Sequence, residues 1–221
     1  MVEKELMQQS TKEMYAILQS ASAKDKNILI EYNFLDAESH KTFFEIGDRI
    51  RVNASNDVAT IFRGGEGVHY LEIVRDVAEK IEVKYSETDN VEKIEQEIFI
   101  KVINDVMKKM SDDERQQFEA SLHNNGIGKQ GMSYAEDDLR KMFMAGVMPV
   151  IGLQLFQVVA AQVARGVLGR AVLAFPPLGV AMPFMGGLLL YELLGPAYRC
   201  TIPTVIQLAY MRQMKKYNEL R

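Results

Sequence analysis

Hydrophobic positions recur at helical spacing through most of the first 110 residues. Over residues 68–83 the apolar side chains follow one another at steps of three and four, which predicts a strongly amphipathic helix. Residues 90–110 carry a second such stripe, and residues 3–19 and 39–52 carry looser ones. The apolar run at 27–35 is too short to distinguish a helix from a strand. We expect an all-α fold.

Short polar signals divide these predicted helices from one another. Asn56 and Asp57 suit the cap of a short helix that ends near Phe62, before glycines at 64, 65 and 67 break the chain. The segments at 111–114 and 133–136 each have the Ser-x-x-Glu spacing of a capping box. Two further helices are therefore predicted to begin at these boxes.

After Lys141 the pattern changes from striped to continuously apolar. Residues 142–164 contain no charged side chain, and as a helix they would be about 34 Å long, enough for a bilayer core of about 30 Å. Residues 171–191 are again uncharged, but prolines at 176, 177 and 183 interrupt them. A basic turn from Arg165 to Arg170 joins the two runs. Together they predict an apolar helical hairpin with a broken second arm.

The last predicted element is an amphipathic helix over residues 201–217 that caps the hairpin. Its apolar face would carry Ile202, Val205, Ile206 and Ala209, with basic residues near its end, where cations stabilise the helix dipole. The pattern as a whole predicts three parts: an N-terminal helical segment at 1–54, an acidic amphipathic helical domain at 55–140, and the apolar hairpin with its basic C-terminal helix at 141–221.

Charge is distributed as unevenly as hydrophobicity. Residues 1–141 contain 19 Lys and Arg against 28 Asp and Glu, a net charge of −9. Residues 142–221 contain 7 against 2, a net charge of +5, and the two halves give the −4 of the whole chain. A basic and apolar half suits an anionic membrane surface, or the acidic half of the same chain.

Several interpretations of the hairpin stay open. Arg140, Lys141, Arg165 and Arg170 flank the apolar runs as interfacial anchors flank a membrane hairpin. A protein that shelters the hairpin in a helical fold and releases it to lipid fits the same pattern. The alternative is a soluble helical assembly factor or chaperone-like protein, in which the hairpin is permanent core and a client protein or a second copy binds elsewhere.

Residues with catalytic or ligand-binding potential are few. Glu66 and His69 have the Glu-x-x-His spacing of di-iron bundles, but no second such pair occurs, so a surface or helix-start histidine is favoured. The glycines after Arg63 resemble a phosphate-binding loop without its lysine and hydroxyl. We expect no enzymatic activity, no cofactor, no metal site and no nucleic-acid partner.

The N-terminus and the cysteine content indicate a compartment. The first residues lack the apolar stretch of a secretory signal. Cys200 is the single cysteine, so no disulfide can form within the chain. We therefore expect the bacterial cytoplasm or the cytoplasmic face of the inner membrane.

Two blocks, residues 56–78 and 195–212, resemble the YaaW-like family of bacterial proteins, which is often labelled as related to the ubiquinol–cytochrome c chaperones. The second block, with the pattern A-Y-R-x-T-I-P-x-V-I-Q-x-A-x-x-R, is the more specific. The resemblance covers roughly residues 55–215, whereas residues 1–50 diverge from it. It implies a helical, non-enzymatic protein of a family with no assigned catalytic residues.

The residues that carry the resemblance are interpreted as structural. They are Arg63, Gly64, Tyr70, Asp76, Tyr198, Arg199, Thr201, Pro203, Gln207 and Arg212. Pro203 suits the first turn of the last helix and Thr201 suits its cap. Arg199 lies at the exit of the predicted hairpin, where we expect it to pair with Glu192 or with an acidic residue of the N-terminal half.

Overall fold

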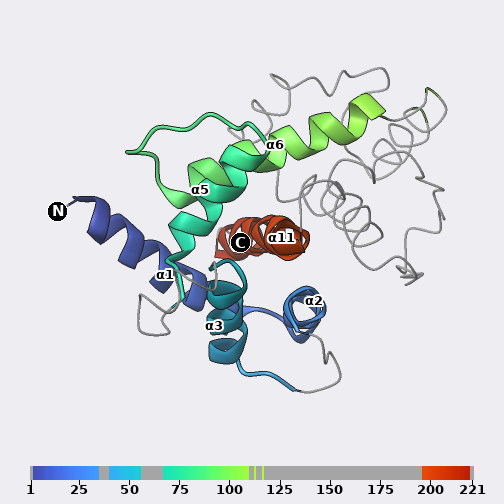
Figure 1. The fold of residues 1–221 in the computed structure, drawn as a ribbon. Coiled ribbons are helices and arrows are strands. Elements are labelled where there is room, and N and C mark those ends of the chain that lie inside the picture. Colours follow the sequence, from blue (N-terminus) through green and yellow to red (C-terminus); the bar gives the residue numbers. More distant parts are fainter. Residues whose placement is uncertain are drawn as a thin grey trace. The chain divides into compact units, whose positions relative to one another are not determined.

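A computed structural model describes residues 2–34, 40–55, 67–109 and 196–219, with two isolated positions, Asp112 and Gln116. The described residues form six α-helices and no strand, which confirms the predicted all-α class. The helices, labelled in Figure 1, are α1 (Val2–Ser20), α2 (Ala23–Asn33), α3 (Phe43–Asn53), α5 (Tyr70–Lys80), α6 (Val91–Lys109) and α11 (Pro196–Glu219).

The chain divides into two compact units. The first unit contains Met1–Phe99 together with Leu194–Arg221, and the second contains Ile100–Leu193. The second unit is therefore an insertion in the sequence of the first. The residues of the predicted apolar hairpin fall within this insertion and lie outside the described residues. The predicted short helix after Asn56 and the helix starts at both capping boxes are likewise not described. The predicted domain boundaries at residues 54 and 140 stay predictions.

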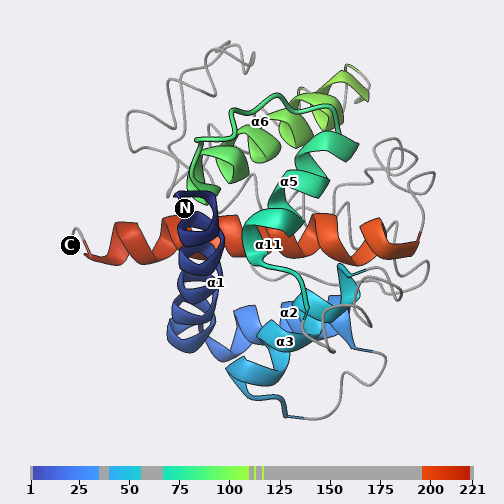
Figure 2. The same ribbon diagram turned by 60° about the vertical axis from the view of Figure 1, so that its left-hand side comes forward.

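Helix α11 is the central element of the first unit. Figure 2 shows it running between the other helices, and it contacts α1, α2, α3 and α5. Every residue from 201 to 209 is buried. The predicted one-sided amphipathic helix is wrong, because neighbouring helices cover this stretch on all sides. The polar residues Thr201, Thr204 and Gln207 are therefore buried along with the aliphatic ones.

The start of α11 also differs from the prediction. The helix begins at Pro196, so Thr201 lies within it and does not cap it, and Pro203 lies in the helix interior and not in the first turn. An interior proline removes one backbone hydrogen bond and costs about 3 kcal/mol. Burial of residues 201–209 offsets this cost. Pro196 occupies the first helical position, where proline loses no hydrogen bond.

The N-terminal helices have well-defined starts. Residues 27–33 of the ambiguous run belong to helix α2, whose N-cap Ser22 accepts a hydrogen bond from the Asp25 backbone N–H. Helix α3 begins at a capping box in which Thr42 and Glu45 each accept from the other's backbone N–H. These local bonds satisfy N–H groups that the first turn leaves free.

Helix α5 is shorter than the predicted 68–83 and is capped from another helix. Two adjacent hydroxyls of α1 accept from its first backbone N–H groups, Thr11 Oγ1 from Tyr70 at 3.1 Å and Ser10 Oγ from Leu71 at 3.0 Å. His69 is the N-cap residue, which agrees with its interpretation as a helix-start histidine. The helix ends at Lys80, and Glu82 takes a positive φ of 60° in the turn that follows.

Candidate functional site

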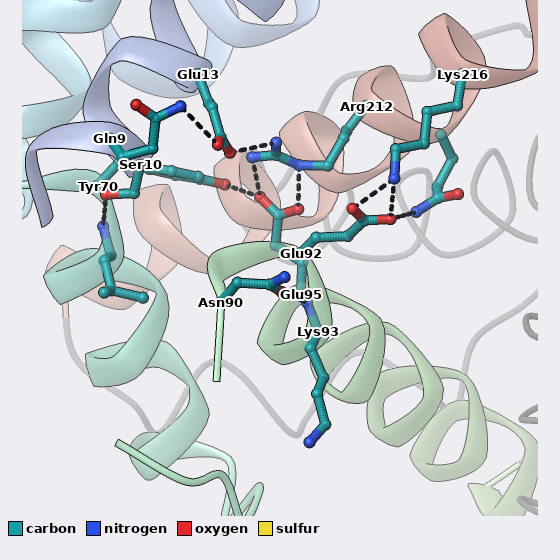
Figure 3. A network of polar contacts seen from close by, with 12 residues as sticks. Gln9, Ser10, Glu13, Tyr70, Asn90, Glu92, Lys93, Glu95, Arg212 and Lys216 are labelled. Carbon is teal, nitrogen blue, oxygen red and sulfur yellow. Dashed lines mark hydrogen bonds and ion pairs between the residues drawn. The ribbon is translucent and has the colours of Figure 1, made fainter. Parts of the chain in front are cut away.

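An arginine and a glutamate form a buried ion pair between α11 and α6 (Figure 3). Arg212 Nε donates to Glu95 Oε2 at 2.8 Å, and Arg212 Nη2 lies 3.4 Å from Glu95 Oε1. Glu95 is only 1% exposed and Arg212 only 8%. Charged side chains are rarely buried to this extent unless they are paired. The pair therefore fixes the end of α11 against the start of α6.

Two further side chains complete this core cluster, which we define as Glu13, Tyr70, Glu95 and Arg212. Tyr70 Oη donates to Glu95 Oε1 at 2.7 Å, and Arg212 Nη1 donates to Glu13 Oε2 at 2.9 Å. The four residues come from α1, α5, α6 and α11. The cluster thus joins four helices of the first unit through hydrogen bonds that are stronger than neutral ones because the groups are charged.

Burial and charge act in opposite directions on the acid–base behaviour of this cluster. Desolvation raises the pKa of Glu95, against the lowering effect of Arg212 and Tyr70. Desolvation also raises the pKa of Tyr70 well above its ordinary value. Burial alone would lower the pKa of Arg212, but the Glu95 carboxylate outweighs it and the net shift is upward. Arg212 is thus held in its charged form.

A second, more exposed ion pair lies beside the core cluster. Lys216 Nζ lies 2.6 Å from Glu92 Oε2, and Gln213 Nε2 donates to Glu92 Oε1 at 3.3 Å. The Lys216 side chain is 51% exposed. Solvent screens such a pair, so it contributes far less to stability than the buried pair one turn earlier.

Polar contacts without an ion pair hold the middle of α11. Asn33 Nδ2 donates to Thr204 Oγ1 at 2.9 Å, and Asn33 Oδ1 accepts from Asn53 at 3.2 Å. Gln207 Nε2 donates to Asp25 Oδ1 at 3.2 Å. Two of these contacts tie α11 to α2, and the Asn33–Asn53 bond ties α2 to α3. Polar groups therefore set the register of the middle of the central helix.

In the first turn of α11, where the structure describes the side chains of Tyr198 and Cys200, Tyr198 makes a hydrogen bond to another helix. Tyr198 Oη donates to Asp76 Oδ1 of α5 at 3.2 Å, and Lys80 Nζ lies 5.0 Å from the centre of the Tyr198 ring. Desolvation raises the pKa of Asp76, and the hydrogen bond from Tyr198 opposes that shift. Asp76 and Lys80 are both exposed. We call this group the Tyr198 contact.

Several residues chosen from the sequence are brought together here. Tyr70 and Arg212 meet through Glu95, and Asp76 meets Tyr198. Thr201, Pro203 and Gln207 lie in the buried part of α11. The side chain of Arg199 lies outside the described residues, as does Glu192, one of its two expected kinds of partner, so this pairing stays a prediction. Other predicted site residues outside the described part are Arg63, Gly64, Arg140, Lys141, Arg165 and Arg170.

Sequence reasoning missed Glu95, the centre of the cluster. A signal was present, because Glu95 stands directly beside the apolar stripe that includes Val91, Ile94 and Ile98. A carboxylate on the buried side of a helix requires a partner. The identity of that partner could not be read from the pattern, since Arg212 lies 117 residues away.

The arrangement is suited to holding helices together. Arg212 donates hydrogen bonds to two carboxylates, and Glu95 accepts hydrogen bonds from both Arg212 and Tyr70. Among the described residues, no group of three His, Cys, Asp or Glu side chains could hold a metal ion. In the same part of the chain, no helix combines the length and the apolar character needed to cross a bilayer.

Comparison with known proteins finds relatives that carry one family name. A UPF0174 protein of Helicobacter pylori is 31% identical over 197 residues, which cover 83% of this chain and 76% of the relative. A second UPF0174 protein of that organism is 25% identical over 209 residues, 85% of this chain and 96% of the relative. The UPF0174 protein YaaW of Escherichia coli is 26% identical over 182 residues, 80% of this chain and 74% of the relative. No family model and no solved structure matches the chain.

Proposed function

The chain belongs to the UPF0174 family, and from its charge pattern and division into units we propose that it is a non-enzymatic helical protein that associates with membranes through residues 142–191. The resemblance to the YaaW-like family is confirmed by its relatives. Association with lipid and the absence of catalysis are our proposals for this chain, as is the cytoplasmic face of the bacterial inner membrane as its location.

One observation carries the proposal: a segment with almost no charge is inserted into the sequence of a unit that has its own polar and apolar core. Between residues 142 and 191 only Arg165 and Arg170 are charged. The first unit is formed by residues from both sides of this segment. Arg212, which follows it, pairs with Glu95 and Glu13, which precede it. The first unit thus has internal contacts that do not depend on where residues 142–191 lie.

The partner that best fits the insertion is an anionic membrane surface. Residues 142–164 are long enough to cross the hydrocarbon core as a helix. Arg140, Lys141, Arg165 and Arg170 lie at the ends of the apolar runs, where cations interact with lipid phosphates. The first unit would stay folded at the surface and carry the insertion to the bilayer.

Flotation of the full-length chain with vesicles of phosphatidylethanolamine and phosphatidylglycerol tests the proposal. The informative variant is Leu155→Lys, which places a charge in the middle of the longest uncharged run. A lysine at the centre of a bilayer-spanning helix costs about 3 kcal/mol, so the floating fraction should fall strongly. The matched control is Gln8→Lys, the same gain of charge at an exposed position of α1.

The outcome separates the proposal from its alternative. Wild type and Gln8→Lys floating together, with Leu155→Lys left at the bottom of the gradient, supports membrane association. If full-length protein stays at the bottom with every vesicle composition, residues 142–191 serve another purpose. The alternative function predicts a different result. Full-length protein would be stable and monodisperse without lipid, and Leu155→Lys would fail to fold. That result would support a soluble assembly factor in which the hairpin is permanent core.

A further inference from the structure

The two ends of α11 are held by contacts of very different strength. Near the C-terminal end, Arg212 donates to two carboxylates and is 8% exposed. At the N-terminal end, Tyr198 makes one hydrogen bond of 3.2 Å to the exposed Asp76. Charge-assisted buried contacts resist opening much more than a single solvent-exposed one. Among the described side chains, the contacts near the C-terminal end of α11 are therefore stronger than the contact of Tyr198 near its start.

Pro203 separates the weakly held turn from the rest of the helix. Because proline has no N–H, the backbone carbonyl of Arg199 lacks the helical donor four residues later. The first turn is joined to the following turn by one hydrogen bond fewer than in an unbroken helix. Proline also disfavours helical φ and ψ angles at the residue before it, here Ile202.

The burial of α11 side chains increases two residues before Pro203. Residues 201–209 are all buried, whereas Tyr198 and Cys200 are only half-buried. Tyr198 and Cys200 therefore have fewer contacts to lose on opening than the residues after Pro203, which are anchored by Asn33, Asp25 and the core cluster. A break in the backbone ladder and a step in burial thus coincide, which is the pattern of a local hinge.

We propose that residues 196–200 form a hinged first turn that opens at Pro203 while the rest of α11 stays packed, and that the Tyr198 contact keeps this turn closed. The second apolar run ends at Tyr191, five residues before Pro196. Opening of the turn would let that run change its environment without unfolding the first unit. This use of the hinge rests on the proposed function, whereas the hinge itself does not.

Cys200 reports directly on the opening, since it is the only cysteine of the chain and lies in the hinged turn. Desolvation raises the pKa of the Cys200 thiol, so the closed turn keeps the thiol poorly reactive. The experiment measures the rate at which a maleimide labels Cys200 in the full-length chain, without lipid and at one fixed pH. Labelling through local opening depends only weakly on urea below the unfolding transition.

The first variant removes one hydroxyl. Tyr198→Phe loses the hydrogen bond to Asp76 and keeps the ring beside Lys80. Labelling should become about fivefold faster, because loss of one ordinary hydrogen bond shifts an opening equilibrium by about that factor. Tyr85→Phe is the matched control: Tyr85 Oη donates to Glu79 at 2.6 Å and its ring lies 5.8 Å from Arg75. It removes a comparable exposed hydrogen bond that involves no residue of α11 and should leave the rate unchanged.

The second variant acts in the opposite direction. Pro203→Ala restores a backbone donor for the Arg199 carbonyl and should slow the labelling of Cys200. Equal labelling rates in wild type and Tyr198→Phe would overturn the hinge, and this holds even if Pro203→Ala does not fold. The hinge would also be overturned if the labelling rate of Tyr198→Phe rose only in parallel with global unfolding by urea.

Addition of phosphatidylglycerol vesicles separates the hinge from the proposed function. If the turn serves the insertion, lipid should accelerate labelling of wild-type Cys200, and Leu155→Lys should cancel that acceleration. A Tyr198→Phe effect without any lipid effect counts against membrane association and leaves the hinge intact. A lipid effect without a Tyr198→Phe effect contradicts the hinge and supports membrane association.

Discussion

Arg212 and Glu95 lie 117 residues apart in the sequence and form a buried ion pair at 2.8 Å. This pair joins α11 to the part of α6 that precedes residue 100, and so joins the two sequence segments of the first unit across the insertion. Removal of one partner leaves an uncompensated charge in the core, which is the most costly kind of single substitution.

Arg212→Met should therefore destabilise the protein by about 3 to 5 kcal/mol in a urea unfolding experiment. The double variant Arg212→Met with Glu95→Leu should recover much of this loss, because two apolar side chains can replace a buried ion pair. Lys216→Ala, at the exposed pair with Glu92, should cost less than about 1 kcal/mol. A loss at Arg212 as small as the loss at Lys216 would show that the buried pair does not hold the unit together.

The raised pKa of Glu95 predicts how stability changes with pH. Because its folded-state pKa lies above its ordinary value of 4.5, the folded state binds this proton more tightly than the unfolded state. The contribution of Glu95 to the free energy of unfolding is therefore fully present below pH 4.5 and is lost as pH rises through the folded-state pKa. Urea unfolding at a series of pH values should show wild type losing stability relative to Glu95→Gln as pH rises above 4.5. A relative gain with rising pH would mean that Arg212 outweighs desolvation.

Thr204→Val should destabilise the middle of α11. Asn33 Nδ2 donates to Thr204 Oγ1 inside the core, and valine offers no acceptor. A buried donor without a partner costs about 1 to 3 kcal/mol. Thr204→Ser keeps the hydroxyl and should cost less, through the lost methyl group alone. Calorimetric melting of both variants distinguishes the contribution of the hydrogen bond from that of packing.

The basic residues that flank the apolar runs should contribute to lipid affinity through charge. Arg165→Glu combined with Arg170→Glu should weaken binding to phosphatidylglycerol vesicles, since each basic residue near such a surface contributes about 1 kcal/mol. Lys4→Glu combined with Lys24→Glu makes the same change of charge at exposed positions of the first unit. Equal loss of affinity in the two double variants would indicate that lipid affinity depends only on the net charge of the chain. Added salt should weaken this electrostatic part of the affinity and leave the part that comes from the apolar runs.

Local patterns predicted the helices well where one face of each helix is buried. Residues 68–83 and 90–110 have clean apolar stripes, and α5 and α6 lie within them. Helix α11 was misjudged because its neighbours bury Thr201, Thr204 and Gln207 as well as the aliphatic residues. Burial on all sides removes the stripe on which sequence reasoning depends.

The candidate site was predictable only in part. The family resemblance pointed to Tyr70 and Arg212, and the structure places both in the core cluster. Neither Glu13 nor Glu95 was found, because an ion pair between distant helices leaves no spacing in the sequence. The position of Pro203 was misread for a related reason, since tertiary packing overrides the local preference of proline for a first turn.

Fractionation of cells that express the full-length chain is the most direct test of membrane association. The chain should sediment with the membranes and stay there after a high-salt wash, and Leu155→Lys should move to the supernatant as a folded protein while Gln8→Lys stays in the pellet. Wild-type protein found wholly in the supernatant would contradict the account.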